Sequence, residues 1–105
     1  MLFRSENPKT PPEVLAILAK DENEYIRYYV ARNPNTPPEV LSILATDRDV
    51  HVRSSFAENP KTPPEVLSIL AKDKNEHIRY YVATNPNISP DTLKILATEI
   101  GRAHV

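Results

Sequence analysis

Aspartate and arginine recur together along this chain at a fixed separation. In three places an arginine follows an aspartate by six residues. A carboxylate and a guanidinium form charge-assisted and often bidentate hydrogen bonds, so the recurring pair predicts a clamp that holds a turn and ties successive units together. The alternative is a row of arginines that contacts phosphates, but each arginine has its own aspartate nearby. The pairs are Asp21 and Arg27, Asp47 and Arg53, and Asp73 and Arg79.

Tyrosines form a second candidate site. Tyr28 and Tyr80 occupy the same position in two related segments, and Ser54 occupies it in the segment between them. On a helical projection both rings point away from the apolar side of their segments. Tyrosine is enriched at the energetic centres of protein interfaces, so we expect a groove for a peptide or protein; ordinary surface tyrosines packed on their own helix are the alternative. The predicted contact zone comprises Tyr28, Ser54, Ser55, Tyr80, Glu24 and Glu76, whereas Tyr29 and Tyr81 are predicted to be structural.

Metal binding and catalysis have little support in the sequence. His51 and His77 share one position of the pattern with Tyr25, but zinc needs ligand nitrogens about 2.0–2.1 Å away, and this position supplies no third ligand. The chain has no cysteine and a single glycine, which excludes a thiol nucleophile and a glycine-rich phosphate loop. We therefore expect no metal, no cofactor and no enzymatic activity.

Composition narrows the choice of partner and compartment. The 105 residues include 13 basic and 14 acidic side chains, a net charge of -1, which argues against a chain attracted mainly by polyanions. The sequence contains no apolar run of the roughly 18 residues that a transmembrane helix needs, and no signal-peptide core follows Met1. We expect a cytoplasmic protein that does not bind membranes. Nucleic acid stays a possible partner through Lys9, Lys20, Lys61, Lys72 and the arginines.

The segments that carry these residues follow a period of 26 residues, marked by Asn-Pro at Asn7, Asn33, Asn59 and Asn85. A fixed period of this size predicts a solenoid, in which each unit buries its apolar face against its neighbours. Asparagine at 35 and 87 alternates with lysine at 9 and 61, which indicates a duplicated unit of 52 residues. We expect one repeat domain over 1–105, with repeats 7–32, 33–58 and 59–84, a capping half-repeat 85–99 and a frayed tail 100–105.

Each repeat is predicted to begin with a capped helix. In Thr10-Pro11-Pro12-Glu13 and its equivalents, the threonine hydroxyl is expected to accept from the third amide while the glutamate reaches back to the cap. This helix should end near Asp21, Asp47, Asp73 and Glu99. Its inward face is predicted to comprise Val14, Leu15, Ile17, Leu18 and Ala19.

A second, shorter helix should follow in each of the first three repeats, starting near residues 24, 50 and 76. The sequence leaves open whether it is α or 3₁₀, and predicts the core pairs Ile26 and Val30, Val52 and Phe56, and Ile78 and Val82. The last unit has Thr92 and Lys94, which predict a polar outer side that ends the array, with Leu93, Ile95 and Leu96 inward.

The motif Asn-Pro-x-Thr-Pro-Pro-Glu-Val-Leu-x-x-Leu-Ala-x-Asp resembles the bacterial leucine-rich repeat variant family, over nearly the whole chain from Asn7 to Glu99. The aspartate, the Val/Ile-Arg pair and the alanine that follow on paired helices resemble HEAT repeats. The resemblance implies an all-α fold, a right-handed solenoid of about 3.5 repeats in which α and 3₁₀ helices alternate. Founding members of the family carry a cysteine cluster for an iron-sulfur centre, and this chain has no cysteine to form one.

The function expected from these features is a non-catalytic scaffold that binds a protein or peptide on its concave surface. A HEAT-like module for nucleic acid is the first alternative. A structural array that associates end to end through Leu2 and Phe3 is the second.

Overall fold

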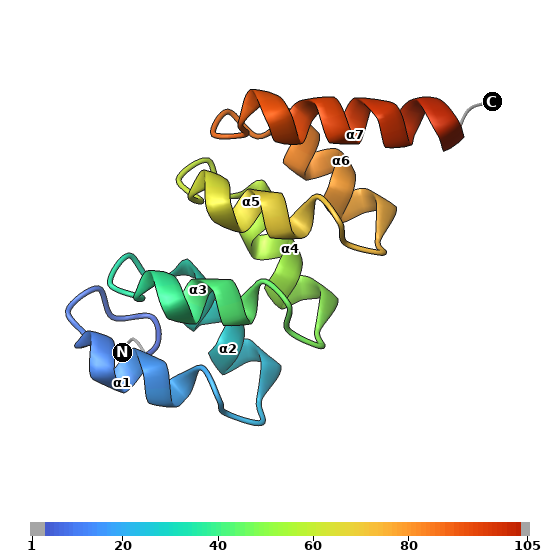
Figure 1. Cartoon of the computed structure of the whole chain (residues 1–105). Coiled ribbons are helices and arrows are strands. Elements are labelled where there is room, and N and C mark those ends of the chain that lie inside the picture. Colours follow the sequence, from blue (N-terminus) through green and yellow to red (C-terminus); the bar gives the residue numbers. More distant parts are fainter. Residues whose placement is uncertain (1–3, 104–105) are drawn as a thin grey trace. The chain divides into compact units, whose positions relative to one another are not determined.

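The computed structural model describes residues 4–103 and the side chains of 4–98. The described residues form seven α-helices and no strand, which confirms the all-helical prediction; the handedness of the array stays a prediction (Figure 1). The chain divides into two compact units, residues 1–56 and 57–105. The helices are α1 (Pro12–Leu18), α2 (Glu24–Arg32), α3 (Pro38–Leu44), α4 (Val50–Glu58), α5 (Pro64–Leu70), α6 (Glu76–Thr84) and α7 (Pro90–Ala103).

Short and longer helices alternate along the chain and pack in sequence order. In the first unit α1 contacts α2, and α2 contacts α3; in the second, α5 contacts α6, and α6 contacts α7. The longer helices α2, α4 and α6 are α-helical over nine residues each, so the alternation with 3₁₀ helices implied by the family resemblance is wrong here. Asn23 explains the regular start of α2, because its side chain accepts a hydrogen bond from the Tyr25 amide, and Asn75 caps α6 in the same way.

The apolar core follows the longer helices closely. Val52, Phe56, Ile78 and Val82 are at most 2 % exposed, which confirms two of the three predicted pairs. In the remaining pair Val30 is fully buried, while Ile26 is only half-buried. Burial of each large apolar side chain contributes about 1.5–3 kcal/mol.

The predicted capping box is wrong. Each of α1, α3 and α5 has proline at the N-cap, which makes no side-chain cap, so the helix begins one residue later than the threonine predicts. The threonines are buried instead and donate to carbonyls of the preceding segment: the Thr36 hydroxyl to the Val30 oxygen at 2.6 Å, and the Thr10 hydroxyl to the Arg4 oxygen. Val30 lies near the end of α2, and its carbonyl also accepts a hydrogen bond from the Asn33 amide at 3.1 Å.

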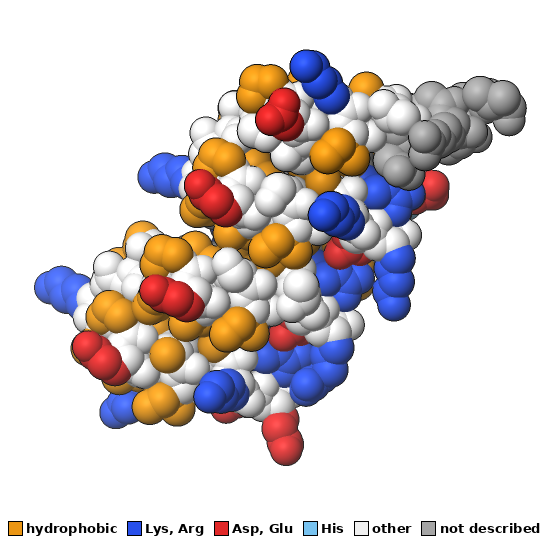
Figure 2. Space-filling view, in the orientation of Figure 1, with side chains coloured by type: hydrophobic (Ala, Val, Ile, Leu, Met, Phe, Trp, Pro, Cys, Tyr) orange, Lys and Arg blue, Asp and Glu red, His pale blue; other side chains and the backbone are white. Residues whose placement is uncertain are grey.

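The first helices are shorter and bury less than the sequence predicts. They end at Leu18, Leu44 and Leu70 rather than near the aspartates. Ile17 is 72 % exposed and Ile43 is 64 % exposed, whereas Leu15 is fully buried. Ile17 lies about 200° around the helix from Leu15, so the face that buries one turns the other to solvent. Hydrophobic side chains accordingly show at the surface over α1 and α3 (Figure 2).

The last helix matches the predicted polar cap only in part. Lys94 is exposed and Leu96 is buried, as expected. Thr92 is 5 % exposed, while Leu93 is 44 % and Ile95 is 48 % exposed, so the prediction is wrong at these three positions. Ser89 accounts for the position of Thr92, because its hydroxyl donates to the threonine oxygen at 2.9 Å and accepts from the threonine amide. Helix α7 also continues beyond Glu99 to Ala103.

Ser89→Ala should destabilise the protein by about 1 kcal/mol, because α7 loses the hydroxyl that satisfies one of its first amides. Urea unfolding followed by circular dichroism measures the change. Ser68→Ala is the matched control: the Ser68 hydroxyl is exposed and donates to the Glu65 carbonyl within α5, so its loss should change the free energy of unfolding by less than about 0.5 kcal/mol. Equal effects of the two substitutions would show that Ser89 does not act as a cap.

Candidate functional site

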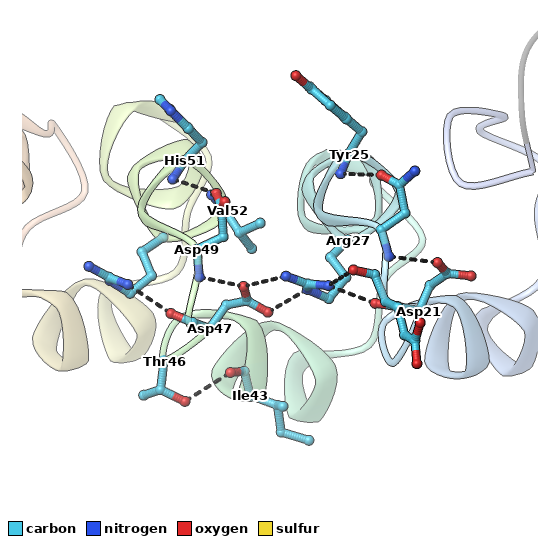
Figure 3. Close-up of polar contacts among 12 residues, drawn as sticks. Asp21, Tyr25, Arg27, Ile43, Thr46, Asp47, Asp49, His51 and Val52 are labelled. Carbon is cyan, nitrogen blue, oxygen red and sulfur yellow. Dashed lines mark hydrogen bonds and ion pairs between the residues drawn. The ribbon is translucent and has the colours of Figure 1, made fainter.

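Arg27 is the most buried charged side chain of the predicted clamp, with 4 % exposure. Its Nη1 donates to the main-chain oxygens of Asp21 at 2.7 Å and Glu22 at 3.0 Å, which close the turn between α1 and α2. Its Nε and Nη2 donate to the two carboxylate oxygens of Asp47 at 2.8 and 3.2 Å (Figure 3). The carboxylate that pairs with Arg27 therefore comes from the following repeat, and Asp21 contributes a carbonyl rather than its side chain.

The same turn geometry recurs in the other repeats. Arg53 Nη1 donates to the Asp47 carbonyl at 2.8 Å, and Arg79 Nη1 donates to the Asp73 carbonyl at 2.5 Å. Each aspartate side chain also accepts an amide two residues ahead, at 2.8–2.9 Å. Each aspartate of the predicted clamp thus lies with its own arginine at a turn that joins a first helix to a second helix.

Asparagine holds the opposite turn, a role that the sequence analysis missed. Asn33 is 5 % exposed, and its Nδ2 donates to the carbonyls of Ser5 and Asn7, both at 2.9 Å. Asn85 repeats the arrangement in the second unit with the carbonyls of Ala57 and Asn59. The Asn-Pro marker was visible as a period, but a carbonyl 26 or 28 residues earlier in the chain is a partner that only folding identifies.

The residues that alternate between repeats have a structural role too. Asn35 Nδ2 donates to the Pro8 carbonyl at 2.6 Å, and Asn87 Nδ2 donates to the Thr62 carbonyl at 3.1 Å. Both bonds reach back to the preceding repeat within the same unit. Lysine stands at the equivalent positions 9 and 61 and has no side-chain amide to make the same bond.

Tyr28 and Tyr80 differ in their surroundings despite their equivalent positions. In α2, Arg32 Nη1 donates to the Tyr28 hydroxyl at 3.1 Å, and the guanidinium carbon lies 5.5 Å from the centre of the ring. Tyr80 on α6 is 62 % exposed. Each ring meets that of the following tyrosine edge to face, with centroids 5.3 and 5.8 Å apart. Tyr29 and Tyr81, predicted to be structural, are 37 % and 40 % exposed, so both rings remain partly open to solvent.

The remaining members of the predicted contact zone are not equally accessible. Ser55 is 3 % exposed and its hydroxyl donates to the Val52 carbonyl at 2.7 Å, so its inclusion in a surface zone is wrong. Ser54 is half-buried and donates to the His51 carbonyl at 3.1 Å. Glu24 and Glu76 are exposed in the first turns of α2 and α6, where a helix dipole favours a negative charge.

The position shared by Tyr25, His51 and His77 is exposed at the start of each second helix. In Figure 3 the side chains of Tyr25 and His51 project away from the Arg27–Asp47 pair. Residues 4–103 contain no group of three histidine or acidic side chains that could hold a metal ion. Over the same residues no helix is long and apolar enough to cross a membrane.

Asp47→Asn should destabilise the protein by about 3 kcal/mol, because it leaves the buried Arg27 guanidinium without its counter-charge. Urea unfolding followed by circular dichroism measures the loss. Asp49→Asn makes the same chemical change two residues away, where the side chain caps α4, and asparagine holds the equivalent positions 23 and 75. That control should stay within about 0.5 kcal/mol of the parent protein. A similar effect for both variants would contradict a special role for the buried pair.

Comparison with known proteins agrees with the geometry of paired helices fastened turn by turn. A family model described as the Leucine Rich Repeat Variant domain matches residues 4–58, which is more than half of the chain. No curated protein and no solved structure gave a significant match. The matched segment contains the Arg27–Asp47 pair, the Asn33 bonds and the first two repeats. The chain therefore belongs to the leucine-rich repeat variant family.

Proposed function

We propose that this protein is a non-catalytic repeat scaffold that binds a protein or peptide partner through its second helices, on the surface predicted to be concave. The exposure of Tyr80 carries the proposal: a large aromatic side chain, 62 % exposed, stands on a helix whose other large side chains are mostly polar or buried. Aromatic residues of this kind are enriched among the residues that dominate binding energy. Membership of a repeat family supports a scaffold rather than an enzyme.

The acidic residues of the second helices suggest the character of this surface. Glu24 and Glu76 are exposed one turn before Tyr28 and Tyr80, so each tyrosine lies beside a carboxylate on its own helix. A partner that presents apolar and basic groups together would match this combination. Nucleic acid fits less well, because the Arg27 guanidinium is buried and its nitrogens already bond to Asp47 and to two carbonyls.

The test is a selection of peptides from a displayed random library on the immobilised protein. Peptides that bind should lose at least about tenfold in affinity when Tyr80 is replaced by serine, the residue found at the equivalent position 54. Tyr25→Ser is the matched control, because Tyr25 is 68 % exposed but lies elsewhere on its helix, and it should leave binding unchanged. Peptides that bind the parent and Tyr80→Ser proteins equally well would refute the proposed surface.

Self-association is a second candidate function. The end-to-end contact expected through Leu2 and Phe3 lies outside the described residues, whereas the apolar surface of the first helices favours association through another face. In the second unit, an open cavity of about 470 Å³ between α5 and α7 includes Ile69 and Ile95 in its lining. In the first unit Ile17 and Ile43 are both more than 60 % exposed. An exposed apolar patch on a single unit can mark an interface.

Light scattering during size-exclusion chromatography tests this candidate. If the apolar face joins two copies, the mass should rise with protein concentration, and Ile95→Gln should restore the monomer mass of 11.9 kDa. Lys94→Gln, an exposed neighbour on the same helix, should leave the assembly intact. A monomer mass for the parent protein at every concentration would exclude self-association.

A further inference from the structure

The two units carry equivalent surface pockets where a second helix ends beside the start of the preceding repeat. Their volumes are about 320 Å³ in the first unit and about 300 Å³ in the second, and each is lined by a tyrosine, a glutamate, and the asparagine and proline of the repeat marker. The pocket of the first unit is lined by Glu6, Tyr29, Arg32, Asn33 and Pro34; that of the second is lined by Ala57, Glu58, Tyr81, Thr84, Asn85 and Pro86.

The buried asparagines fix the glutamate at each pocket. Asn33 donates to the carbonyls of the residues on either side of Glu6, at 2.9 Å each. Asn85 does the same around Glu58, at 3.0 and 2.9 Å. The main chain that bears the carboxylate is thus held in place before any ligand arrives, which lowers the entropy that binding would lose.

In the first unit the chain supplies its own cation. Arg32 lines the pocket together with Glu6 and Tyr29, and its guanidinium lies over the Tyr28 ring with a hydrogen bond to the hydroxyl. A guanidinium can stack on an aromatic face and can also pair with a carboxylate. The first unit therefore shows a guanidinium held on a tyrosine ring at a pocket whose lining also includes a glutamate.

In the second unit the cation is missing from the equivalent position. Thr84 replaces Arg32, and its hydroxyl donates to the Tyr81 carbonyl at 3.1 Å on its own helix. The Tyr80 ring, equivalent to the one that holds Arg32, is 62 % exposed, and Glu58 is exposed at the pocket. The second unit keeps the carboxylate of Glu58 in the pocket lining and the Tyr80 ring next to that of Tyr81, but it has threonine where the first unit has the guanidinium.

We infer that the pocket of the second unit binds the guanidinium of an arginine side chain from a partner peptide, in the place that Arg32 holds in the first unit. The Tyr80 ring stacks on the guanidinium, and the Glu58 carboxylate supplies the counter-charge. The inference rests on the proposed function as a peptide-binding scaffold and names the partner's anchoring residue.

Nuclear magnetic resonance titration with the blocked tripeptide acetyl-Gly-Arg-Gly-amide tests the inference on the full chain. Addition of the tripeptide should shift the amide signals of Glu58, Tyr80, Tyr81 and Thr84. The same tripeptide with citrulline, which keeps the shape of arginine but has no charge, should bind at least about tenfold more weakly. Equal binding of the two tripeptides, or shifts confined to other residues, would overturn the inference.

Two substitutions test the position of the ligand. Each replaces a residue of one unit by the residue that the other unit has at the equivalent position. Thr84→Arg should fill the pocket from within and abolish the shifts, whereas Thr84→Gln, which adds length without charge, should preserve them. Arg32→Thr should open the first pocket and add a second set of shifts at Glu6, Tyr28 and Tyr29. Unchanged tripeptide binding by Thr84→Arg would contradict the proposed position of the ligand.

The experiment separates this inference from the proposed function. If displayed peptides bind through Tyr80 but need no arginine and tolerate Thr84→Arg, the scaffold function holds and the arginine pocket is refuted. If the tripeptide binds at the pocket while no displayed peptide is selected, the pocket is established as a site for an isolated arginine side chain, and the extended peptide-binding surface is refuted.

Discussion

A helix of seven residues is too short to persist alone in water, so the fold depends on whatever fastens each short helix to its neighbours. The Arg27–Asp47 pair is the clearest such interaction. One guanidinium closes the turn of its own repeat through two carbonyls and joins the next repeat through a carboxylate. Because both charges are at most 9 % exposed, neither can be left alone without a large desolvation cost.

Buried polar side chains hold both turns of the first repeat. Arg27 holds the turn from the first helix to the second, and Asn33 holds the turn from the second helix to the next repeat. The apolar core of the first unit includes Leu15 and Val30, which are fully buried. In this arrangement the outward faces of the helices are not needed to hold the turns or to form the core. Tyrosine, isoleucine and glutamate can occupy those faces without disturbing the stack.

Much of the fold could be predicted from the sequence, because the same pattern of residues recurs in every repeat. The period, the paired helices, the buried residues of the second helices and the participation of Arg27 and Asp47 all follow from local patterns. Predictions failed where the outcome depended on competition among partners. Thr36 could cap α3 or donate to the Val30 carbonyl. It donates to the carbonyl, and the proline after it takes the N-cap position instead. Ile17 has an apolar side chain, but no neighbouring element covers its side of the helix. Equally, nothing in the sequence alone shows that Arg32 rests on the ring of Tyr28.

The bonds of the asparagines also bear on how quickly such a chain reaches its native state. Those made by Asn33, Asn35, Asn85 and Asn87 to the preceding repeat join residues only 25 to 28 positions apart. Chains whose contacts are close in sequence lose little loop-closure entropy before those contacts form. A unit of two repeats can thus assemble before distant parts of the chain meet, and lengthening the array by further units would leave the rate of this local step nearly unchanged.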